Sequence, residues 1–135
     1  MKRLVFAEDD HHIAVLVEFC LEDLGFEVEH FDTGIEAWQR LEQGPAPDVC
    51  ILDLQMPGMT GLEILTRLKA DPERAGIPVL ILSARAKDAD RARAVAFGAA
   101  AYLTKPFDTA ELCATVESLA SVGRAASESD CGADQ

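Results

Sequence analysis

The stretch Val49-Cys50-Ile51-Leu52-Asp53 decides the fold. Four apolar residues in a row, followed at once by a carboxylate, are typical of a strand that is buried on both faces and ends at a polar edge. A second apolar run covers residues 77–82 (IPVLIL), and a shorter one covers residues 4–7 (LVFA). Strands buried on both faces belong to parallel sheets with helices on either side, so helices are expected between these runs.

The segments between the apolar runs have the helical period. Apolar residues recur at steps of three and four from Ile13 to Leu24, and Gly25 stands where this helix would end. Asp10 precedes the helix as a cap, and either Asp108 or Thr109 can cap the last one. The remaining expected helices begin at Thr33 and cover 62–68, 89–97 and 109–119, and the remaining expected strands cover 26–31, nearer the sheet edge, and 102–104.

Five strand–helix repeats in a chain of 135 residues predict one α/β domain. Right-handed crossovers between parallel strands give a three-layer, doubly wound (βα)5 arrangement, although periodicity does not give the strand order. The last segment, 123–135, is small, polar and acidic. The sequence therefore predicts a domain at residues 1–122 and a flexible acidic tail at 123–135.

Composition excludes several classes of function. The chain has 24 acidic and 12 basic residues, a net charge of −12, which argues against direct binding of nucleic acid or of an anionic membrane surface. No apolar run reaches the ~18–20 residues that a membrane helix requires, so no membrane insertion is expected. The four cysteines lie far apart without a C-x-x-C pair, which favours reduced thiols in a cytoplasmic protein, with Cys50 in the core.

Polar side chains follow four of the predicted strands. They are Glu8-Asp9-Asp10, Asp53, Ser83 and Lys105. The carboxyl ends of parallel strands meet at one edge of a sheet, where several carboxylates repel one another unless a cation lies among them. Oxygen ligands in a small open site favour Mg²⁺. A lysine and a hydroxyl opposite the carboxylates suit phosphoryl transfer, and a carboxylate nucleophile would form an aspartyl phosphate.

Each of these residues also has a plainer interpretation. The acidic triplet could serve only the dipole of the helix that follows it. Asp53 could cap the next turn, and Lys105, which precedes Pro106, could be a solvated loop residue. The combination at four strand ends is what favours a phosphoryl site over these separate explanations.

The motifs and their order resemble the receiver domain of bacterial two-component response regulators, the CheY-like family. The resemblance runs in family order over residues 2 to about 121. It implies a flavodoxin-like fold with strand order 2-1-3-4-5. The matching stretches are LVFAEDD at 4–10, DLQMPGMTG at 53–61, LSAR at 82–85 and YLTKPF at 102–107.

The resemblance implies a role for each residue of the acidic site. Asp53 matches the phosphoacceptor. Asp9 matches the carboxylate that binds Mg²⁺ directly, and Glu8 matches the one that usually acts through a water. Gln55 stands where a backbone carbonyl, not a side chain, completes the metal shell.

The resemblance also implies a switch. Lys105 matches the lysine that pairs with the acceptor carboxylate and then with the phosphoryl group, and the bond before Pro106 is typically cis. Ser83 matches the hydroxyl that turns toward the phosphoryl group. Tyr102 matches the aromatic residue that swings inward with it.

The implied function is a phosphoacceptor switch, not a classical enzyme. A sensor histidine kinase or a histidine phosphotransfer protein would supply the phosphoryl group, and a downstream protein target would read the state. A single-domain regulator is expected, because the sequence starts at Met1 and its tail, ending in Asp134-Gln135, has a natural composition. A monomer or weak dimer is expected, because Ala100, Ala101 and Thr115 stand where the dimerising winged-helix subclass carries charges. The alternatives are a receiver cut from a larger DNA-binding or hybrid-kinase protein, a receiver that works without phosphorylation, and a Mg²⁺-dependent phosphohydrolase. The last would need a catalytic acid where Gln55 stands.

Overall fold

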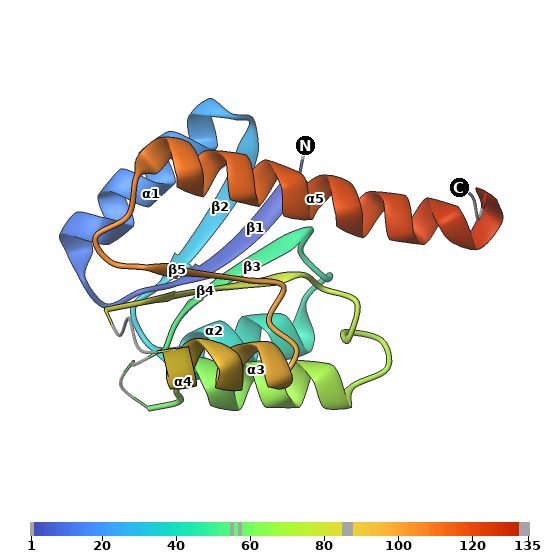
Figure 1. Ribbon diagram of the computed structural model, residues 1–135, viewed down its shortest axis with the longest axis horizontal. Helices are drawn as coiled ribbons and strands as arrows, with labels where there is room; N and C mark the ends of the chain where they lie inside the picture. The colour runs from blue at the N-terminus through green and yellow to red at the C-terminus, as the bar shows by residue number, and fades with distance from the viewer. Residues whose placement is uncertain (1, 55, 57, 85–87, 133–135) are drawn as a thin grey trace.

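The computed structural model of the chain is a five-stranded parallel sheet between two layers of helices (Figure 1). It describes residues 2–54, 56, 58–84 and 88–132, with side chains for all of these except 88 and 122–132. The strand order is β2-β1-β3-β4-β5, and every neighbouring pair is parallel. The elements in chain order are β1 (Lys2–Ala7), α1 (His11–Asp23), β2 (Phe26–Phe31), α2 (Gly34–Gln43), β3 (Val49–Asp53), α3 (Gly61–Ala70), β4 (Val79–Ser83), α4 (Asp88–Ala96), β5 (Ala101–Thr104) and α5 (Thr109–Gly132).

The predicted fold class is confirmed, including the strand order that the family resemblance implied. β2 lies at an edge of the sheet and β3 at its centre, as their sequence patterns indicated. Several boundaries differ from the expected ones, and the strand expected from residue 77 begins at Val79. Pro78 has no N–H to donate, and the amide of Ile77 instead donates to the carbonyl of Arg74 at 3.1 Å, which closes the turn after α3.

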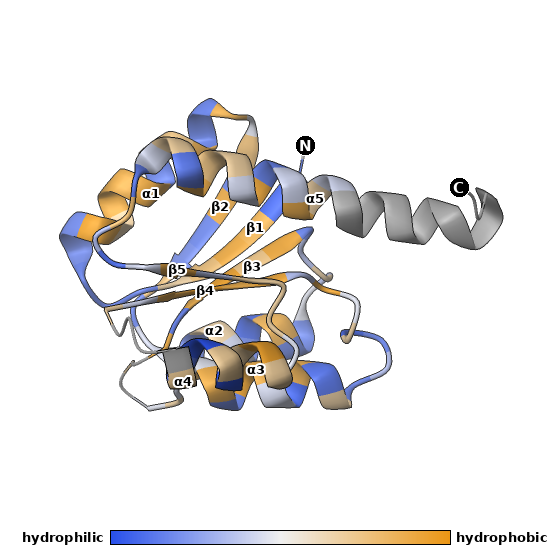
Figure 2. Ribbon diagram, in the orientation of Figure 1, coloured by the Kyte–Doolittle hydropathy of each residue, from blue (hydrophilic) through white to orange (hydrophobic). Residues whose placement is uncertain are grey.

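Each face of the sheet has its own core. Helices α1 and α5 cover one face, and α2, α3 and α4 cover the other (Figure 1). Alternate residues of β1 point to opposite cores, with Val5 on the side of α2–α4 and Phe6 on the side of α1 and α5. Cys50 is fully buried on the α2–α4 side, as predicted. The central strands β3 and β4 are apolar along most of their length, whereas the edge strand β2 also carries hydrophilic residues (Figure 2).

Side-chain caps fix where the helices begin. The carboxylate of Asp10 accepts from the amides of His12 and Ile13 and so caps α1. Thr60 and Glu63 form a reciprocal capping box at the start of α3. At α5 the carboxylate of Asp108 accepts from the amide of Ala110 at 2.8 Å, so Asp108, of the two candidates, supplies the cap.

Helix α5 continues past the predicted end of the domain. α5 is drawn through Gly132, so residues 123–132 of this helix lie within the range predicted as a tail. The domain boundary at 122 and the flexible acidic tail stay predictions. Within the described part of the chain, no helix is both long and apolar enough to cross a membrane.

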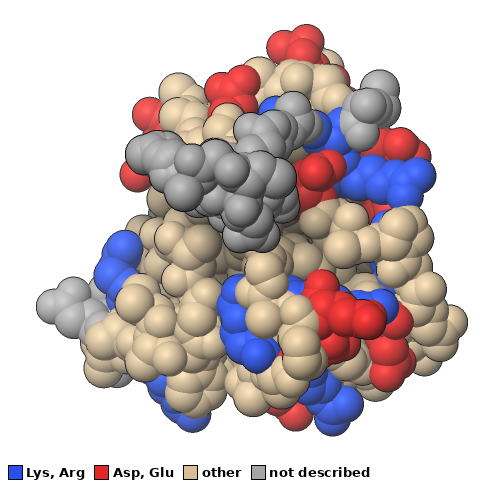
Figure 3. Space-filling view, turned by 90° about the vertical axis from the view of Figure 1, so that its right-hand side faces the viewer, with Lys and Arg blue, Asp and Glu red and all other residues tan. Residues whose placement is uncertain are grey.

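The amino edge of the sheet carries charges of both signs. Figure 3 views the molecule from this side and shows Lys and Arg beside Asp and Glu. Arg3 at the start of β1 lies 4.0 Å from Glu27, and Arg40 lies 2.8 Å from Glu29. The Arg40 side chain, which hydrogen-bonds Glu29, lowers the pKa of that carboxyl. Pairs of opposite charge give this edge no single sign, and exposed pairs such as Arg3 with Glu27 add little to stability.

Candidate functional site: a carboxylate and lysine cluster at the sheet edge

Four adjacent strands deliver the predicted site residues to one edge. Glu8 follows β1, Asp53 ends β3, Ser83 ends β4 and Lys105 follows β5. Because β1, β3, β4 and β5 are consecutive in the sheet and parallel, their carboxyl ends lie next to one another. Residues that are up to 97 positions apart in the sequence are thereby brought into contact.

Three carboxylates form the acidic part of the site. Glu8, Asp9 and Asp53 each place one carboxylate oxygen within 4.8 Å of the others. Glu8 is fully buried, Asp53 is 7% exposed and Asp9 is exposed, so the cluster opens to solvent on the side of Asp9. An all-oxygen donor set with one open side fits a hard divalent cation such as Mg²⁺. Asp10, the third acid of the triplet, is used as the cap of α1.

Lys105 connects two of these carboxylates. Its Nζ lies 2.7 Å from Glu8 Oε1 and 2.9 Å from Asp53 Oδ2. The amide of Lys105 donates to the carbonyl of Ser83 at 2.7 Å, which fixes the loop after β5 against the end of β4. The peptide bond between Lys105 and Pro106 is cis, as the resemblance implied.

Burial and charge act together on the protonation of this cluster. Burial, with the neighbouring charge of Asp53, raises the pKa of Glu8 to about 7, although its hydrogen bond to Lys105 works in the opposite direction. For Lys105, burial opposes the ammonium, but hydrogen bonds to Glu8 and Asp53 and their charges outweigh it, so the pKa of Lys105 is raised. The Lys105 ammonium therefore stays charged at neutral pH, whereas the carboxyl of Glu8 binds its proton more tightly than an exposed glutamate does.

The two residues predicted to act as a switch lie on the neighbouring strands β4 and β5. Ser83 is 1% exposed at the end of β4, and it pairs in register with Thr104 of β5. Tyr102 is buried on β5, with Arg91 Cζ 5.0 Å from the centre of its ring. Gln55, predicted to contribute its backbone carbonyl, lies outside the described residues.

Sequence reasoning missed His30, which positions the end of β1. Its Nε2 donates to the carbonyl of Glu8 at 2.8 Å, and its ring packs on Phe6 with centroids 5.4 Å apart. The amide of Glu8 donates to the carbonyl of Phe31 at 3.0 Å. These two bonds anchor the backbone of Glu8 to β2. A histidine at an otherwise apolar position of an alternating strand was the available signal.

Gly61 is a second residue that the sequence alone did not single out as part of the site. Its amide donates to the carbonyl of Leu54 at 3.1 Å. A Cβ atom at this position would collide with the carbonyl oxygen of Asp53. The start of α3 therefore packs directly against the backbone of the central carboxylate, which only a glycine permits.

This geometry defines the class of protein, and comparison with known proteins agrees. The model of the response regulator receiver domain family matches residues 4–117. The chain belongs to this family, the phosphoacceptor domains of two-component signalling, which act as switches and not as classical enzymes.

Curated relatives include the phosphate regulon transcriptional regulatory protein PhoB of Rhizobium meliloti, which is 39% identical over 119 residues, 88% of this chain and 52% of that protein. The DNA-binding dual master transcriptional regulator RpaA of Synechocystis is also 39% identical, over 88% of this chain and 49% of its own length. The chain thus spans about half the length of the curated relatives that it matches.

A similar solved structure is the receiver domain of a sensor histidine kinase from Pseudomonas aeruginosa PAO1. It has a TM-score of 0.80 and 26% identity, covering 89% of this chain and 98% of that one. That structure has a magnesium ion coordinated in its active-site cleft. The cluster of Glu8, Asp9 and Asp53 is consistent with a receiver magnesium site.

Proposed function

We propose that Asp53 accepts a phosphoryl group from the phosphohistidine of a sensor histidine kinase or a histidine phosphotransfer protein. The observation that carries the proposal is the bridging of Glu8 and Asp53 by the Lys105 ammonium, beside the third carboxylate of Asp9. Glu8, Asp9, Asp53 and the backbone carbonyl of Gln55 would hold Mg²⁺. Bound there, Mg²⁺ would supply positive charge in addition to that of Lys105.

The chain's own residues then do the following. A carboxylate oxygen of Asp53 attacks the phosphorus, a P–O bond forms, and the P–N bond to the imidazole breaks with its electron pair left on nitrogen. Lys105, already 2.9 Å from Asp53, stabilises the charge that builds on the phosphoryl oxygens. The hydrogen bonds of His30 and Phe31 to the backbone of Glu8 keep the metal-binding side of the site in place. Water later hydrolyses the acyl phosphate.

The phosphorylated state is read through protein contacts. The phosphoryl oxygens offer new hydrogen-bond acceptors, which favour a state with the hydroxyl of Ser83 and the ring of Tyr102 turned inward. This shifts the surface formed by α4 and β5, where a downstream protein target binds. The protein acts in the cytoplasm as a monomer or weak dimer, without direct contact with nucleic acid.

Helix α1 offers an apolar surface for the phosphodonor. Val15, Leu16 and Phe19 are 66%, 43% and 72% exposed, which is costly on a helix that has no partner. This α1 patch begins a little over one turn after Asp10, the cap that follows Glu8 and Asp9 in the chain. A helical donor that covers the patch would bring its phosphohistidine to Asp53.

The domain could be a whole single-domain protein or part of a longer protein. As a single-domain regulator, the chain passes its state directly to a separate protein. As part of a longer protein like the PhoB relatives, it would control an attached output domain. The size of the endogenous protein, measured with an antibody to the domain, decides between a chain of this length and one about twice as long.

The acceptor is tested by incubating the protein with acetyl phosphate and Mg²⁺ and measuring its intact mass. The wild-type chain is expected to gain one phosphoryl group, and Asp53→Asn none. Asp23→Asn, a substitution of an exposed aspartate at the far end of α1, is the matched control and should be labelled as the wild type. Undiminished labelling of Asp53→Asn would contradict the site assignment.

A further inference from the structure

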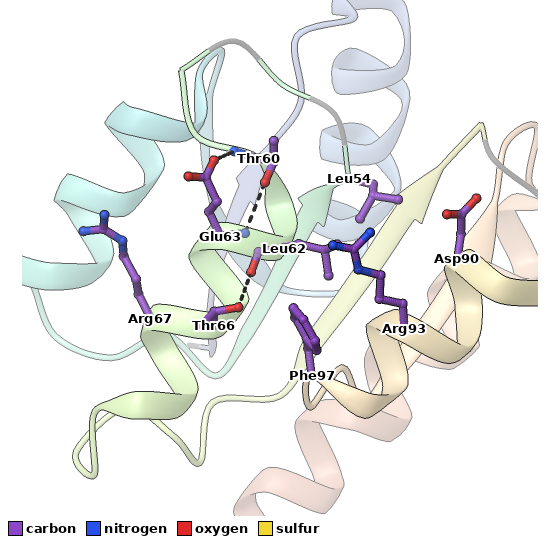
Figure 4. A pocket seen from close by; sticks show the side chains of 9 residues that line it. All are labelled: Leu54, Thr60, Leu62, Glu63, Thr66, Arg67, Asp90, Arg93 and Phe97. Carbon is purple, nitrogen blue, oxygen red and sulfur yellow. Dashed lines mark hydrogen bonds between the residues drawn. The ribbon is translucent and has the colours of Figure 1, made fainter.

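A cavity separate from the carboxylate cluster lies between α3 and α4, on the sheet face away from α1 and α5 (Figure 4). Its volume is about 470 Å³, a size typical of small-molecule sites. Leu54, the residue after Asp53, and Leu62 and Phe97 give it an apolar interior (Figure 4). The lining residues are Leu54, Thr60, Leu62, Glu63, Thr66, Arg67, Asp90, Arg93 and Phe97.

The polar groups on the α3 side of this cavity are engaged within their own helix. The carboxylate of Glu63 accepts from the amide of Thr60 at 2.9 Å, and the Thr60 hydroxyl accepts from the amide of Glu63 at 3.2 Å. The hydroxyl of Thr66 donates to the carbonyl of Leu62 at 2.8 Å. These groups stabilise α3, so they are not the ones that would orient a ligand.

The α4 side presents a cation. The guanidinium of Arg93 reaches between the two helices beside Leu62 (Figure 4), and its Cζ lies 5.8 Å from the ring centre of Phe97. Among the described residues, no carboxylate lies within ion-pair distance of Arg93. Arg93 is an exposed side chain at the mouth of the cavity, where its planar N–H donors are available to a carboxylate.

The charge of Arg93 and the apolar side chains of the lining favour a ligand with one negative charge and an apolar body. The guanidinium selects an anion, but the net charge of −12 disfavours ligands with several negative charges. Arg67, the other cation of the lining, rests 5.8 Å from the ring centre of Trp38 on α2 and so faces a different aromatic residue. Asp90 also lines the cavity from α4, and its carboxylate disfavours a second negative charge on the ligand. One guanidinium beside leucine and phenylalanine side chains therefore matches an apolar body with a single carboxylate.

We propose that the cavity between α3 and α4 binds an aromatic monocarboxylate, with its ring against Leu54, Leu62 and Phe97 and its carboxylate on Arg93. This site is separate from the phosphoacceptor cluster, so the inference does not rest on the proposed function. Asp53→Asn is expected to bind such a ligand as the wild type does.

The experiment is a titration of the ¹⁵N-labelled chain with 1-naphthoate, followed by amide chemical shifts. Saturable shift changes are expected in α3 and α4, and 1-naphthamide, which lacks the charge, is expected to bind about tenfold more weakly. Arg93→Gln should weaken naphthoate binding by about tenfold and leave naphthamide binding unchanged. Arg91→Gln is the matched control, since Arg91 is on the same helix but lies over Tyr102, and should bind both probes as the wild type does.

A second variant tests the cavity itself. Thr66→Phe fills it from the exposed side of α3 and should weaken binding of both probes. The ¹⁵N spectrum of each variant reports at the same time whether the fold is retained. The proposal is overturned if a folded Arg93→Gln binds naphthoate as the wild type does, if the shift changes centre on the α1 patch, or if no saturable binding occurs.

Discussion

The ammonium of Lys105 lies 2.7 Å from the carboxylate of Glu8, a little closer than its 2.9 Å to Asp53. The lysine that would serve the phosphoryl group is thus also the partner of the most buried acid in the site. Structure and proposed chemistry depend on the same charge, and this relationship gives the first two predictions.

Lys105→Met is expected to affect both stability and phosphorylation. Removing one partner of a buried ion pair leaves two carboxylates facing each other, so the free energy of unfolding at pH 8 should fall by about 2–4 kcal/mol. Labelling of Asp53 by acetyl phosphate should slow by about 10²-fold. Urea unfolding and the labelling rate measure the two effects. Lys105→Arg, which keeps the charge, is the control, and an unchanged unfolding energy in the Met variant would contradict the pairing.

The stability of the metal-free protein should fall between pH 4.5 and 7. Folding raises the pKa of Glu8 from its ordinary 4.5 to about 7, chiefly through burial. Below pH 4.5 both states hold the proton and Glu8 has no effect. As pH rises, the unfolded chain releases its proton first, so the free energy of unfolding declines and levels off above pH 7.

Glu8→Gln isolates this effect. The variant should lose this part of the pH dependence, a difference on the order of 1–3 kcal/mol between pH 4.5 and 8. Urea unfolding in EDTA at a series of pH values measures it. A wild-type stability that rises over this range while Glu8→Gln follows the same curve would contradict the raised pKa.

Gly61→Ala, at the first residue of α3, should lower the stability more than Gly→Ala at an open position does. Its Cβ would meet the backbone of Asp53, so α3 must shift, at a cost of about 1–3 kcal/mol, and labelling of Asp53 should slow. Gly76→Ala is the matched control, because no atom lies within 4 Å of a Cβ at that position. The control should be neutral or more stable by about 0.4–1 kcal/mol. Equal unfolding midpoints for the two variants would contradict the close approach.

Phe19→Ser should separate the two kinds of phosphodonor. Loss of this exposed ring is expected to slow phosphotransfer from a cognate kinase or phosphotransfer protein by about tenfold, because the α1 patch no longer anchors the donor. Labelling by acetyl phosphate, which needs no docking surface, should be unchanged. Val95→Ser, at an exposed apolar residue of α4, is the control and should affect neither rate. Equal slowing with both donors would place the defect in the site and not in docking.

The sequence predicts the fold because its signals are local. The run at Val49–Asp53 and the caps Asp10 and Thr33 are each complete within a few residues, and the structure confirms them. The strand order depends on pairings between distant segments, which periodicity does not report. It came instead from the family resemblance.

The residues of the candidate site also differ in whether local sequence signals predict them. Glu8, Asp9, Asp53, Ser83 and Lys105 were predictable because each follows a recognisable strand. The contribution of His30 was not, because its hydrogen bond joins the ends of two strands through a backbone carbonyl 22 residues away. The separation of Asp10 from the other acids was predictable, because Asp10 stands directly before a helical segment, and the structure confirms that its carboxylate caps α1.

The sequence distances within the site bear on when the protein becomes functional during synthesis. Lys105 is 97 positions from Glu8 and 52 from Asp53, so the acids leave the ribosome long before their cation. A nascent chain that ends before β5 presents the carboxylates without the ammonium that joins them, and its strand β4 lacks a neighbour on one side. Phosphorylation of such a chain at Asp53 is expected to be slow, so the proposed signal would be received efficiently only by chains that include β5.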